Sequence, residues 1–500
     1  MTEIDSDARP LFRKVLIANR GEIAVRVMRT LREMNIPSVA IYHRVEAEAA
    51  HVRFADEAHE IFGDTPVAAH LDADRIIAIA QACGADAIHP GYGFLSENAA
   101  FARKVAAAGL TFIGPDADTI DLMGDKISAR EFAARHGAPV APSVQAGDDI
   151  EAFVVEAQTI GFPLLIKAAA GGGGKGMSIV RDASELRERA RLAAGEARRY
   201  FGDGRIYAET YVERPRHIEV QVLGDGAGQA IHLFERECSV QRRFQKIIEE
   251  APAAPLPAGA REAICEAAVR LAAAARYRNA GTIEFILGAD GRFFFLEMNT
   301  RLQVEHPVTE MICNIDLVRA QIEIAAGLAM PLVQTQTRAS GHSIECRICA
   351  EEPDNNFLPA TGVIRLLHAP VGPHVRFESA LCEGQRVSAD FDPMLAKLVV
   401  WGTDRSQAID RMVAALRELT VLGLRTNIDY LVRILRTNAF RSGSIHTGFV
   451  VEQAAELAPV PAARRDRDHA LIIAALGQRE FRAAIENVEE PYASIGGWRN

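Results

Sequence analysis

Short apolar runs alternate with amphipathic stretches over the first 120 residues, and this alternation restricts the fold more than any other feature of the chain. The runs Lys14–Ala18, Ser38–Tyr42, Ala85–His89 and Thr111–Gly114 are typical of strands, and helical patterns lie between them. Strands that alternate with helices form parallel sheets covered by those helices. The sequence therefore predicts a parallel α/β domain over about residues 10 to 120.

The middle of the chain differs, because glycines rather than a helix join two strands there. Phe162–Lys167 and Met177–Val180 are typical of strands, and Gly171–Gly176 lies between them. A dinucleotide fingerprint requires a helix after its glycines, and a phosphate loop requires Ser or Thr after its lysine, whereas Gly176 follows Lys175 here. This order favours a hairpin whose amides close over phosphates. A flexible hairpin tip is the alternative.

Composition excludes several classes of protein. The 500 residues include 56 Lys and Arg against 66 Asp and Glu, a net charge of -10, so neither nucleic acid nor an anionic membrane is an expected partner. Hydrophobic residues make up 49%, as in folded globular proteins, and no run of about 18 apolar residues predicts a membrane span. Seven cysteines without framework spacing and an acidic N-terminus without a targeting pattern make the cytoplasm the expected location.

The stretch that follows the apolar run Phe293–Leu296 carries the strongest chemical signal. Polar residues occupy every second position there, namely Glu297, Asn299, Arg301, Gln303 and Glu305. An extended chain would place all five side chains on one face. Acid and amide oxygens bind hard cations, so Glu297 and Asn299, with Glu284 as a third ligand, predict a magnesium site shared with nucleotide phosphates. A hydrogen-bonded core carboxylate is the alternative for Glu284.

Arg301 and Glu305 predict chemistry on a small oxyacid. The planar guanidinium of Arg301 suits bicarbonate or a carboxylate, and a second carboxylate beside that ligand is placed to remove its proton. A simple ion pair for Arg301 and a surface position for Glu305 are the alternatives. His217 alternates with apolar residues in Arg216–Val222 and would by itself be structural, as the charged run Gln241–Glu250 would by itself be exposed.

Five segments together resemble the biotin carboxylase family, and the resemblance extends over about residues 12 to 448. The segments are Ile17–Ala24, His89–Asn98, Met123–Lys126, Gly171–Gly176 and Glu297–Glu310. The resemblance implies an ATP-grasp fold with α/β and α+β parts: an N-terminal parallel α/β domain, an ATP-binding domain with a mobile glycine-rich lid, and a C-terminal mixed domain. The implied boundaries are 1–125, 126–330 with the lid at about 140–210, 331–450, and 451–500 as a linker and short helix leading to a missing downstream region.

The resemblance also implies a role for each matching residue. ATP would be contacted by Lys126, Lys167, Gly173, Gly174, Glu209, Tyr211, Val212, His217 and Gln241. Magnesium, or manganese in its place, would be bound by Glu284, Glu297 and Asn299. Bicarbonate would be held by Lys246, Arg301, Gln303 and Val304. Glu305 would be the general base, and Arg347 would stabilise the biotin enolate.

The implied reaction is the ATP-dependent carboxylation of biotin through carboxyphosphate, the first half-reaction of a biotin-dependent, acyl-CoA type of carboxylase. The implied partners are a biotin carboxyl carrier domain or protein and a carboxyltransferase subunit, within a homodimer or a larger complex. No Met-Lys-Met occurs in the chain, so we do not expect it to carry its own biotin. Residues 451–500 resemble the junction in longer α subunits, which favours a shortened chain over the alternative of a natural stand-alone subunit.

Two positions depart from the family pattern, and other functions stay open. Phe244 stands where many relatives have a polar residue, often His, near the nucleotide, and Cys349 replaces a frequent Asn.

An ATP-grasp enzyme that joins a carboxylate to an amine through an acyl phosphate would use the same lid and metal ligands. A nucleotide-binding subunit without catalysis is disfavoured by the intact metal and base residues, and a dehydrogenase by the strand that follows the glycines.

Overall fold

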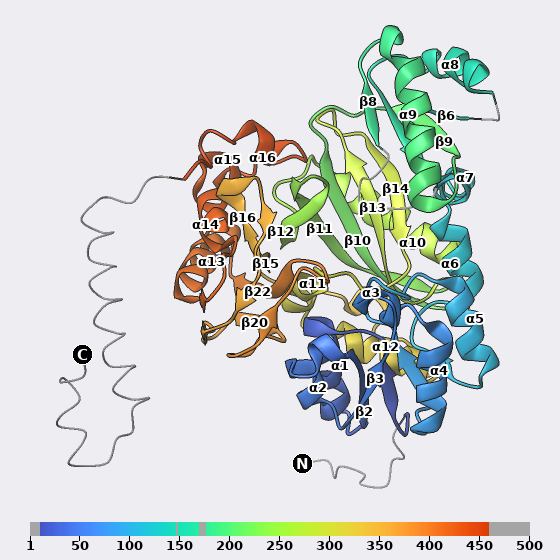
Figure 1. Cartoon of the computed structure of the whole chain (residues 1–500). Helices are drawn as coiled ribbons and strands as arrows, with labels where there is room; N and C mark the ends of the chain where they lie inside the picture. Colours follow the sequence, from blue (N-terminus) through green and yellow to red (C-terminus); the bar gives the residue numbers. More distant parts are fainter. Residues whose placement is uncertain (1–10, 147–148, 170–176, 460–500) are drawn as a thin grey trace, which may run out of the picture. The chain divides into compact units, whose positions relative to one another are not determined.

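The computed structural model describes residues 11–146, 149–169 and 177–459 (Figure 1). The chain divides into one compact unit, Met1–Leu457, and a second from Ala458 onward, and the first unit is described below. Gly173, Gly174 and residues 460–500 of the expected linker lie outside the described residues. Among the helices that are described, none is long and apolar enough to cross a membrane.

The N-terminal part is a five-stranded parallel sheet with the strand order β3-β2-β1-β4-β5, which confirms the predicted α/β domain. The sequence interpretation found four of these strands and missed β3 (Glu57–Ile61), because this edge strand is polar and only half-buried. The remaining elements are β1 (Val15–Ile17), α1 (Gly21–Glu33), β2 (Ser38–His43), α2 (Ala50–Phe54), α3 (Pro66–His70), α4 (Ala73–Ala82), β4 (Ala87–His89), α5 (Ala99–Ala107), β5 (Thr111–Phe112) and α6 (Ala117–Gly124).

Asn19 joins the carboxyl ends of the neighbouring strands β1 and β4. Its Nδ2 donates to the carbonyl oxygens of Pro90 and Tyr92, each at 2.8 Å. Gly91 has a φ of +63°, and a Cβ there would lie 2.8 Å from the same Nδ2. Glycine is therefore required at this position both by the backbone conformation and by the space. Two motifs that are 71 to 73 residues apart thus form one tight loop pair.

A second, four-stranded sheet has the order β6-β9-β7-β8, and all of its neighbouring strands are antiparallel. The long helix α9 (Ala183–Phe201) packs on it through small and apolar side chains that include Leu186 and Ala190. Asp182 caps α9 by accepting a hydrogen bond from the Ser184 amide at 2.8 Å. The remaining elements are α7 (Lys126–Arg135), β6 (Ser143–Gln145), α8 (Ile150–Gln158), β7 (Leu164–Ala168), β8 (Ser178–Val180) and β9 (Ile206–Thr210).

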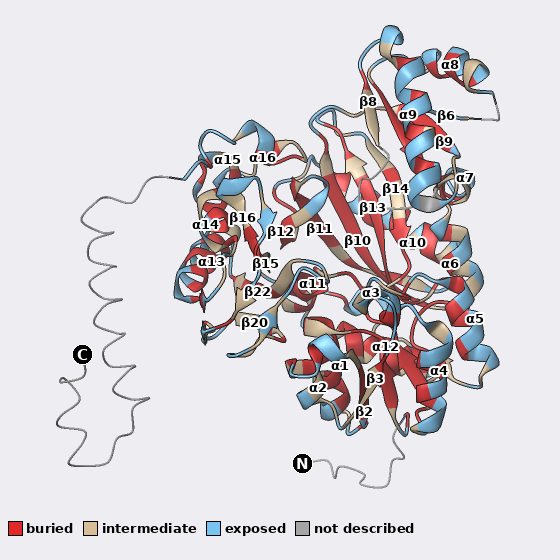
Figure 2. Cartoon of the chain, in the orientation of Figure 1, coloured by how far each residue is buried: buried red, intermediate tan, exposed pale blue. Residues whose placement is uncertain are grey.

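One antiparallel sheet of eight strands extends from the central part of the chain into its C-terminal part, in the order β14-β13-β10-β11-β12-β15-β22-β20. Its central strands are buried along most of their length (Figure 2). Its strands are β10 (Arg216–Asp225), β11 (Ala230–Arg242), β12 (Gln245–Ala251), β13 (Arg278–Leu287), β14 (Phe293–Asn299), β15 (His342–Cys349), β20 (Val375–Ser379) and β22 (Met394–Gly402).

Helices cover this sheet and form its apolar cores. The helix α10 packs on β10 and β11, and α13 packs on β15 and β22. These helices are α10 (Ala260–Ala274), α11 (His306–Cys313), α12 (Leu317–Ala325), α13 (Arg405–Glu418), α14 (Ile428–Arg436), α15 (Asn438–Arg441) and α16 (Phe449–Glu452). Short strand pairs complete the C-terminal part, formed by β16 (Glu351–Glu352), β17 (Leu358–Pro359), β18 (Gly362–Val363), β19 (Leu366–His368), β21 (Arg386–Val387) and β23 (Thr420–Leu422).

Candidate active site

A cavity of about 1480 Å³ is lined by loops and helices of the N-terminal part and by residues of the four-stranded and eight-stranded sheets. Most of the residues predicted from the sequence line it, namely Lys167, Glu209, Tyr211, Val212, His217, Gln241, Lys246, Glu284, Glu297, Asn299, Arg301, Gln303, Val304 and Arg347. Lys126 and Glu305 lie directly behind this lining, since they bond Glu297 and Lys246 respectively. The fold therefore gathers every described candidate around one cavity.

Glu305 is fully buried at the start of α11, and two cations hold its carboxylate. Lys246 Nζ donates to Oε1 at 2.6 Å, and Arg347 Nη2 donates to Oε2 at 2.9 Å. Burial by itself raises the pKa of the Glu305 carboxyl, but Lys246, Arg347 and Arg236 together lower this pKa well below its ordinary value. Glu305 is therefore ionised, as a general base must be, and its proton affinity depends on where these cations point.

Lys246 donates hydrogen bonds to three carboxylates. Besides Glu305, its Nζ donates to Glu284 Oε1 at 3.0 Å and to Glu219 Oε2. Burial favours the neutral amine, but the surrounding thiol and carboxylates keep the pKa of Lys246 well above its ordinary value. Lys246 thus stays a cation that can donate to an anionic ligand in the cavity.

Arg236, which the sequence interpretation did not single out, holds the Glu219 carboxylate that contacts Lys246. It is fully buried on β11, and its Nε donates to Glu219 Oε1 at 2.5 Å. Its Nη1 donates to Gln221 at 2.8 Å and its Nη2 donates to Thr282 at 3.0 Å. A buried arginine with this many acceptors fixes Glu219 on the neighbouring strand, and Glu219 in turn fixes Lys246.

Glu284 lies at the centre of a second hydrogen-bond network. His217 Nε2 lies 2.8 Å from Glu284 Oε2, and His217 Nδ1 lies 2.7 Å from Gln241 Nε2. The amides of Asn299 and Gln303 each donate to Glu284 Oε1 at 2.9 Å. Although burial opposes it, Lys246 and His217 lower the pKa of Glu284 well below its ordinary value, so this carboxylate is an anion.

The predicted metal ligands fit a divalent cation. Glu284 and Glu297 are directly opposite each other on β13 and β14, and Asn299 follows two residues later on β14. Lys126 donates to Glu297, and it is the first cause of the lowered pKa of this carboxyl. Two ionised carboxylates and an amide oxygen that line one cavity are a donor set for a hard ion. Glu284, Glu297 and Asn299 would hold it.

The cavity also combines buried charge with apolar walls. Lys167 Nζ lies 2.5 Å from Glu209 Oε1, and Arg130 Nη1 donates to Glu209 Oε2 at 2.8 Å. Apolar side chains line the same cavity, among them Leu165, Met177, Ile179, Ile286 and Phe294. Apolar walls with a few fixed polar groups are typical of small-ligand sites and suit a flat aromatic base.

The expectation of one extended face from Glu297 to Glu305 is wrong. The strand β14 ends at Asn299, and the chain turns before α11, whose first turn contains Pro307. The polar side chains still converge, because Arg301 reaches back along the turn. Its Nη2 donates to Asn299 Oδ1 at 2.9 Å and its Nη1 donates to Gln303 Oε1 at 3.0 Å. Hydrogen bonds within a turn, rather than the pleat of a strand, therefore bring these groups together.

Two further contacts fix the residues expected at bicarbonate. Arg301 Nε donates to Glu97 Oε2 at 2.8 Å, so the motif that follows β4 helps to orient this guanidinium. Lys397 Nζ donates to the carbonyl oxygen of Val304 at 2.8 Å. The sequence interpretation predicted the roles of Arg301 and Val304 without these supporting residues, because the partners lie far away in the chain.

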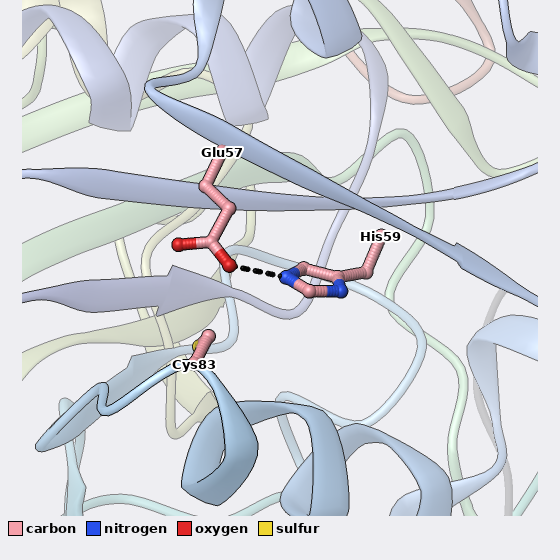
Figure 3. Close-up of side chains that lie close together, drawn as sticks. All are labelled: Glu57, His59 and Cys83. Carbon is pink, nitrogen blue, oxygen red and sulfur yellow. Dashed lines mark hydrogen bonds and ion pairs between the residues drawn. The ribbon is translucent and has the colours of Figure 1, made fainter.

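Another group of potential metal ligands, Glu57, His59 and Cys83, lies in the N-terminal domain (Figure 3). These residues do not line the cavity. His59 Nε2 lies 2.7 Å from one Glu57 oxygen, and Lys14 Nζ donates to the other at 2.7 Å and to the Cys83 carbonyl oxygen at 2.8 Å. The Lys14 ammonium already supplies the positive charge that Glu57 requires, so the group is explained by packing between β1, β3 and α4.

Three family descriptions match consecutive parts of the chain. Residues 11–120 match the biotin carboxylase N-terminal domain, residues 125–333 match the ATP-binding domain of the carbamoyl-phosphate synthase L chain, and residues 345–452 match the biotin carboxylase C-terminal domain.

Curated relatives match over most of the chain. The biotin carboxylase of Nostoc sp. is 47% identical over 442 residues, which cover 88% of this chain and 99% of that protein. The mitochondrial methylcrotonoyl-CoA carboxylase subunit alpha of Rattus norvegicus is 47% identical over 448 residues, which cover 89% of this chain and 63% of that protein. The chain therefore spans somewhat less than two thirds of the length of this longer relative.

Solved structures agree with these relatives. The biotin carboxylase domain dimer of the 2-oxoglutarate carboxylase from Hydrogenobacter thermophilus, in complex with MgADP, ADP and bicarbonate, matches with a TM-score of 0.87 at 45% identity, covering 90% of this chain and 99% of that one. The biotin carboxylase from Campylobacter jejuni, in complex with an ATP compound, matches with a TM-score of 0.86 at 42% identity, covering 88% and 99%.

Proposed function

Because this chain belongs to the biotin carboxylase family, whose members are ATP-dependent ligases with an ATP-grasp fold, we propose that it carboxylates biotin at the cavity described above, with bicarbonate and ATP as the other substrates. The observation that carries the proposal is the convergence of Lys246, Arg301, Glu305 and Arg347 between oxygen ligands for a cation and an apolar pocket. Phosphoryl transfer to bicarbonate requires such positioning and charge neutralisation.

At the nucleotide end, Lys126, Lys167 and His217 are the proposed contacts to ATP. The apolar walls beside Glu209, Tyr211 and Val212 are the proposed adenine site, with Gln241 orienting the imidazole of His217. Gly173 and Gly174 lie outside the described residues, so their place over the phosphates stays an expectation from the sequence. Magnesium or manganese, when bound, neutralises phosphate charge and orients the γ-phosphate.

At the bicarbonate end, Lys246, Arg301, Gln303 and Val304 are the proposed anion site. Glu305 is the proposed base that takes the bicarbonate proton as the bicarbonate oxygen attacks the γ-phosphate, and ADP leaves as carboxyphosphate forms. The cations that lower the pKa of Glu305 also oppose this step. An anionic substrate that draws Lys246 away would relieve part of that effect and raise the proton affinity of Glu305 when the proton must be taken.

In the second half of the proposed reaction, carboxyphosphate breaks down into carbon dioxide and phosphate. The phosphate takes the ureido proton, and the biotin nitrogen then attacks carbon dioxide. Negative charge develops on the ureido oxygen during this step. Arg347 lines the cavity and stays protonated, since the neighbouring acids keep its pKa above the ordinary value although burial opposes it. A fixed guanidinium is suited to stabilise that charge.

The division of the chain into 1–125, 126–330, 331–450 and 451–500 stays part of the proposal, as do the partners. We propose a separate biotin carboxyl carrier and a carboxyltransferase as partners, in line with the longer relatives of the acyl-CoA carboxylase type. We also propose the cytoplasm as location. All seven cysteines lie within the described residues and are free, which supports a reducing compartment.

A bicarbonate-dependent ATPase assay, run with and without free biotin, tests the function. We expect ADP release that requires bicarbonate and rises with biotin, together with transfer of labelled carbon from bicarbonate to biotin. ADP release that is independent of biotin but rises with an amine would instead assign the chain to the carboxylate-amine ligases. ADP release that responds neither to biotin nor to an amine would indicate a nucleotide-binding protein that does not catalyse biotin carboxylation.

A further inference from the structure

The guanidinium of Arg347 is held along two edges by two different acids. Its Nη2 donates to Glu305 at 2.9 Å, and its Nε donates to Glu249 Oε1 at 2.6 Å. Glu305 has a role in the proposed reaction, whereas Glu249 has none so far. Glu249 is fully buried on β12 and does not line the cavity. Two hydrogen bonds from different edges of a planar group fix both its position and its plane.

A third acid, Glu345, stands directly opposite Glu249 on β15. It is fully buried, and neither of its carboxylate oxygens has a hydrogen-bond partner among the described residues. Burial first, and then Glu249 and Glu305, keep the pKa of Glu345 well above its ordinary value although Lys397 and Arg347 oppose this. A buried carboxyl without donors avoids the cost of an isolated charge by staying protonated. We therefore treat Glu345 as neutral.

We propose that Glu249 is a positioning residue for the biotin step: it anchors Arg347 through Nε, so that the Nη edge stays between Glu305 and the cavity. The inference rests on the function proposed above. The charge of Glu249 also raises the proton affinity of Glu305, because two buried anions beside one guanidinium disfavour each other's ionisation. Glu249 thereby serves the base as well as the arginine.

The charge of Glu249 is sensitive to pH in the neutral range. Burial raises its pKa to about 7, although Arg347 opposes this. The groups that face it are Glu345 and Arg347 from β15, Glu305 from the start of α11, Lys246 from its own strand and Cys238 from β11, with Lys397 on β22 opposite Arg347. Because the folded pKa lies above the usual value for Glu, the anion that anchors Arg347 is present above about pH 7 and is lost as the pH falls below it.

Three variants of the full chain test the proposal, each measured for biotin carboxylation, for the KM of ATP and for the pH profile of kcat. Glu249→Gln should lower kcat by about 10- to 100-fold, the usual cost of a misplaced catalytic group, with the KM of ATP unchanged and the acid limb near pH 7 gone. Glu345→Gln is the matched control, since it changes a neighbouring buried acid that is already neutral, and it should keep most of the activity. Glu249→Asp keeps the charge and should give an intermediate kcat and retain the acid limb.

Near-normal kcat in Glu249→Gln would overturn the proposal, and so would an equal loss in Glu249→Gln and Glu345→Gln, because either result removes the special role of Glu249. If Glu249→Gln does not fold, Glu249→Asp decides: an intermediate kcat supports the anchor, and full activity means that Glu249 contributes only stability. Failure of the proposed function is a separate result, since the unmodified chain would then not carboxylate biotin at all.

Discussion

Replacing Glu305 by Gln should nearly abolish biotin carboxylation while leaving ATP binding intact. A positioned general base contributes about 10²- to 10⁴-fold to a rate, which corresponds to about 3 to 5 kcal/mol of activation free energy. The amide keeps the shape of the side chain but cannot accept the bicarbonate proton. Glu305 accepts hydrogen bonds from Lys246, Arg347 and the Cys238 thiol, none of which is a proposed ATP contact, so the affinity for ATP should not change.

The same substitution should cost far less stability than activity. When the Glu305 charge is removed, Lys246 keeps Glu219 and Glu284 as acceptors, and Arg347 keeps Glu249. Neither cation is left alone, so the loss is limited to two charge-assisted hydrogen bonds, about 1 to 3 kcal/mol of unfolding free energy. The loss of activity should therefore be measurable in a protein that is still folded.

Glu310→Gln provides a matched control. Glu310 is also buried and held by two arginines, with Arg26 at 2.8 Å and Arg376 at 2.7 Å, but it does not line the cavity. Both variants should lose similar amounts of thermal stability, and only Glu305→Gln should lose transfer of labelled carbon from bicarbonate to biotin. Near-normal turnover in Glu305→Gln, or an equal loss in Glu310→Gln, would refute the assignment of the base.

Three other predictions follow from the same structure. Arg347→Ala should lower the kcat of biotin carboxylation by about 10²- to 10³-fold and spare nucleotide binding measured by calorimetry, because the proposed role of Arg347 is to stabilise charge at biotin. An unchanged rate would remove it from the mechanism. Phe244, which is 53% exposed beside the cavity with a φ of +66°, should tolerate His, and Phe244→His should lower the KM of ATP without raising kcat; a higher KM would mean that the ring already packs against the nucleotide. Burial opposes ionisation of Glu250, but His342 and Arg405 lower the pKa of this carboxyl from 4.5 to about 2. The ionised Glu250 should therefore contribute about 3 kcal/mol of unfolding free energy above pH 4.5, and this contribution should disappear as the pH falls to 2. Urea unfolding of the wild type and of Glu250→Gln should therefore give free energies that converge over this range, and a constant difference would contradict the sign.

The sequence predicted the elements and the chemical groups of the site better than their connections. Four of the five parallel strands and the residues around the cavity follow from patterns that are local in the chain. The contacts that orient those residues are not local, since Arg347 and Glu249 are 98 residues apart and Arg301 and Glu97 are 204 apart. Strand register decides such pairs, and periodicity does not contain the register.

Local patterns also fail where a turn imitates a strand. The alternation from Glu297 to Glu305 continues past the end of β14, because polar side chains at every second position can also bond one another within a turn. The polar edge strand β3 was missed for the opposite reason, since it lacks the apolar alternation that a half-buried strand shows.

The pairing of β12 with β15 limits how the C-terminal third of the molecule can be exchanged between relatives. Hydrogen bonds across this seam join Arg347 on β15 to Glu249 on β12 and to Glu305, the proposed base, before α11. A chimaera joined near residue 330 would therefore combine two halves of one sheet from different parents. Such a hybrid should fold and work only when both parents share the side chains along β12 and β15, whereas the four-stranded sheet of β6 to β9 is the natural unit for grafting.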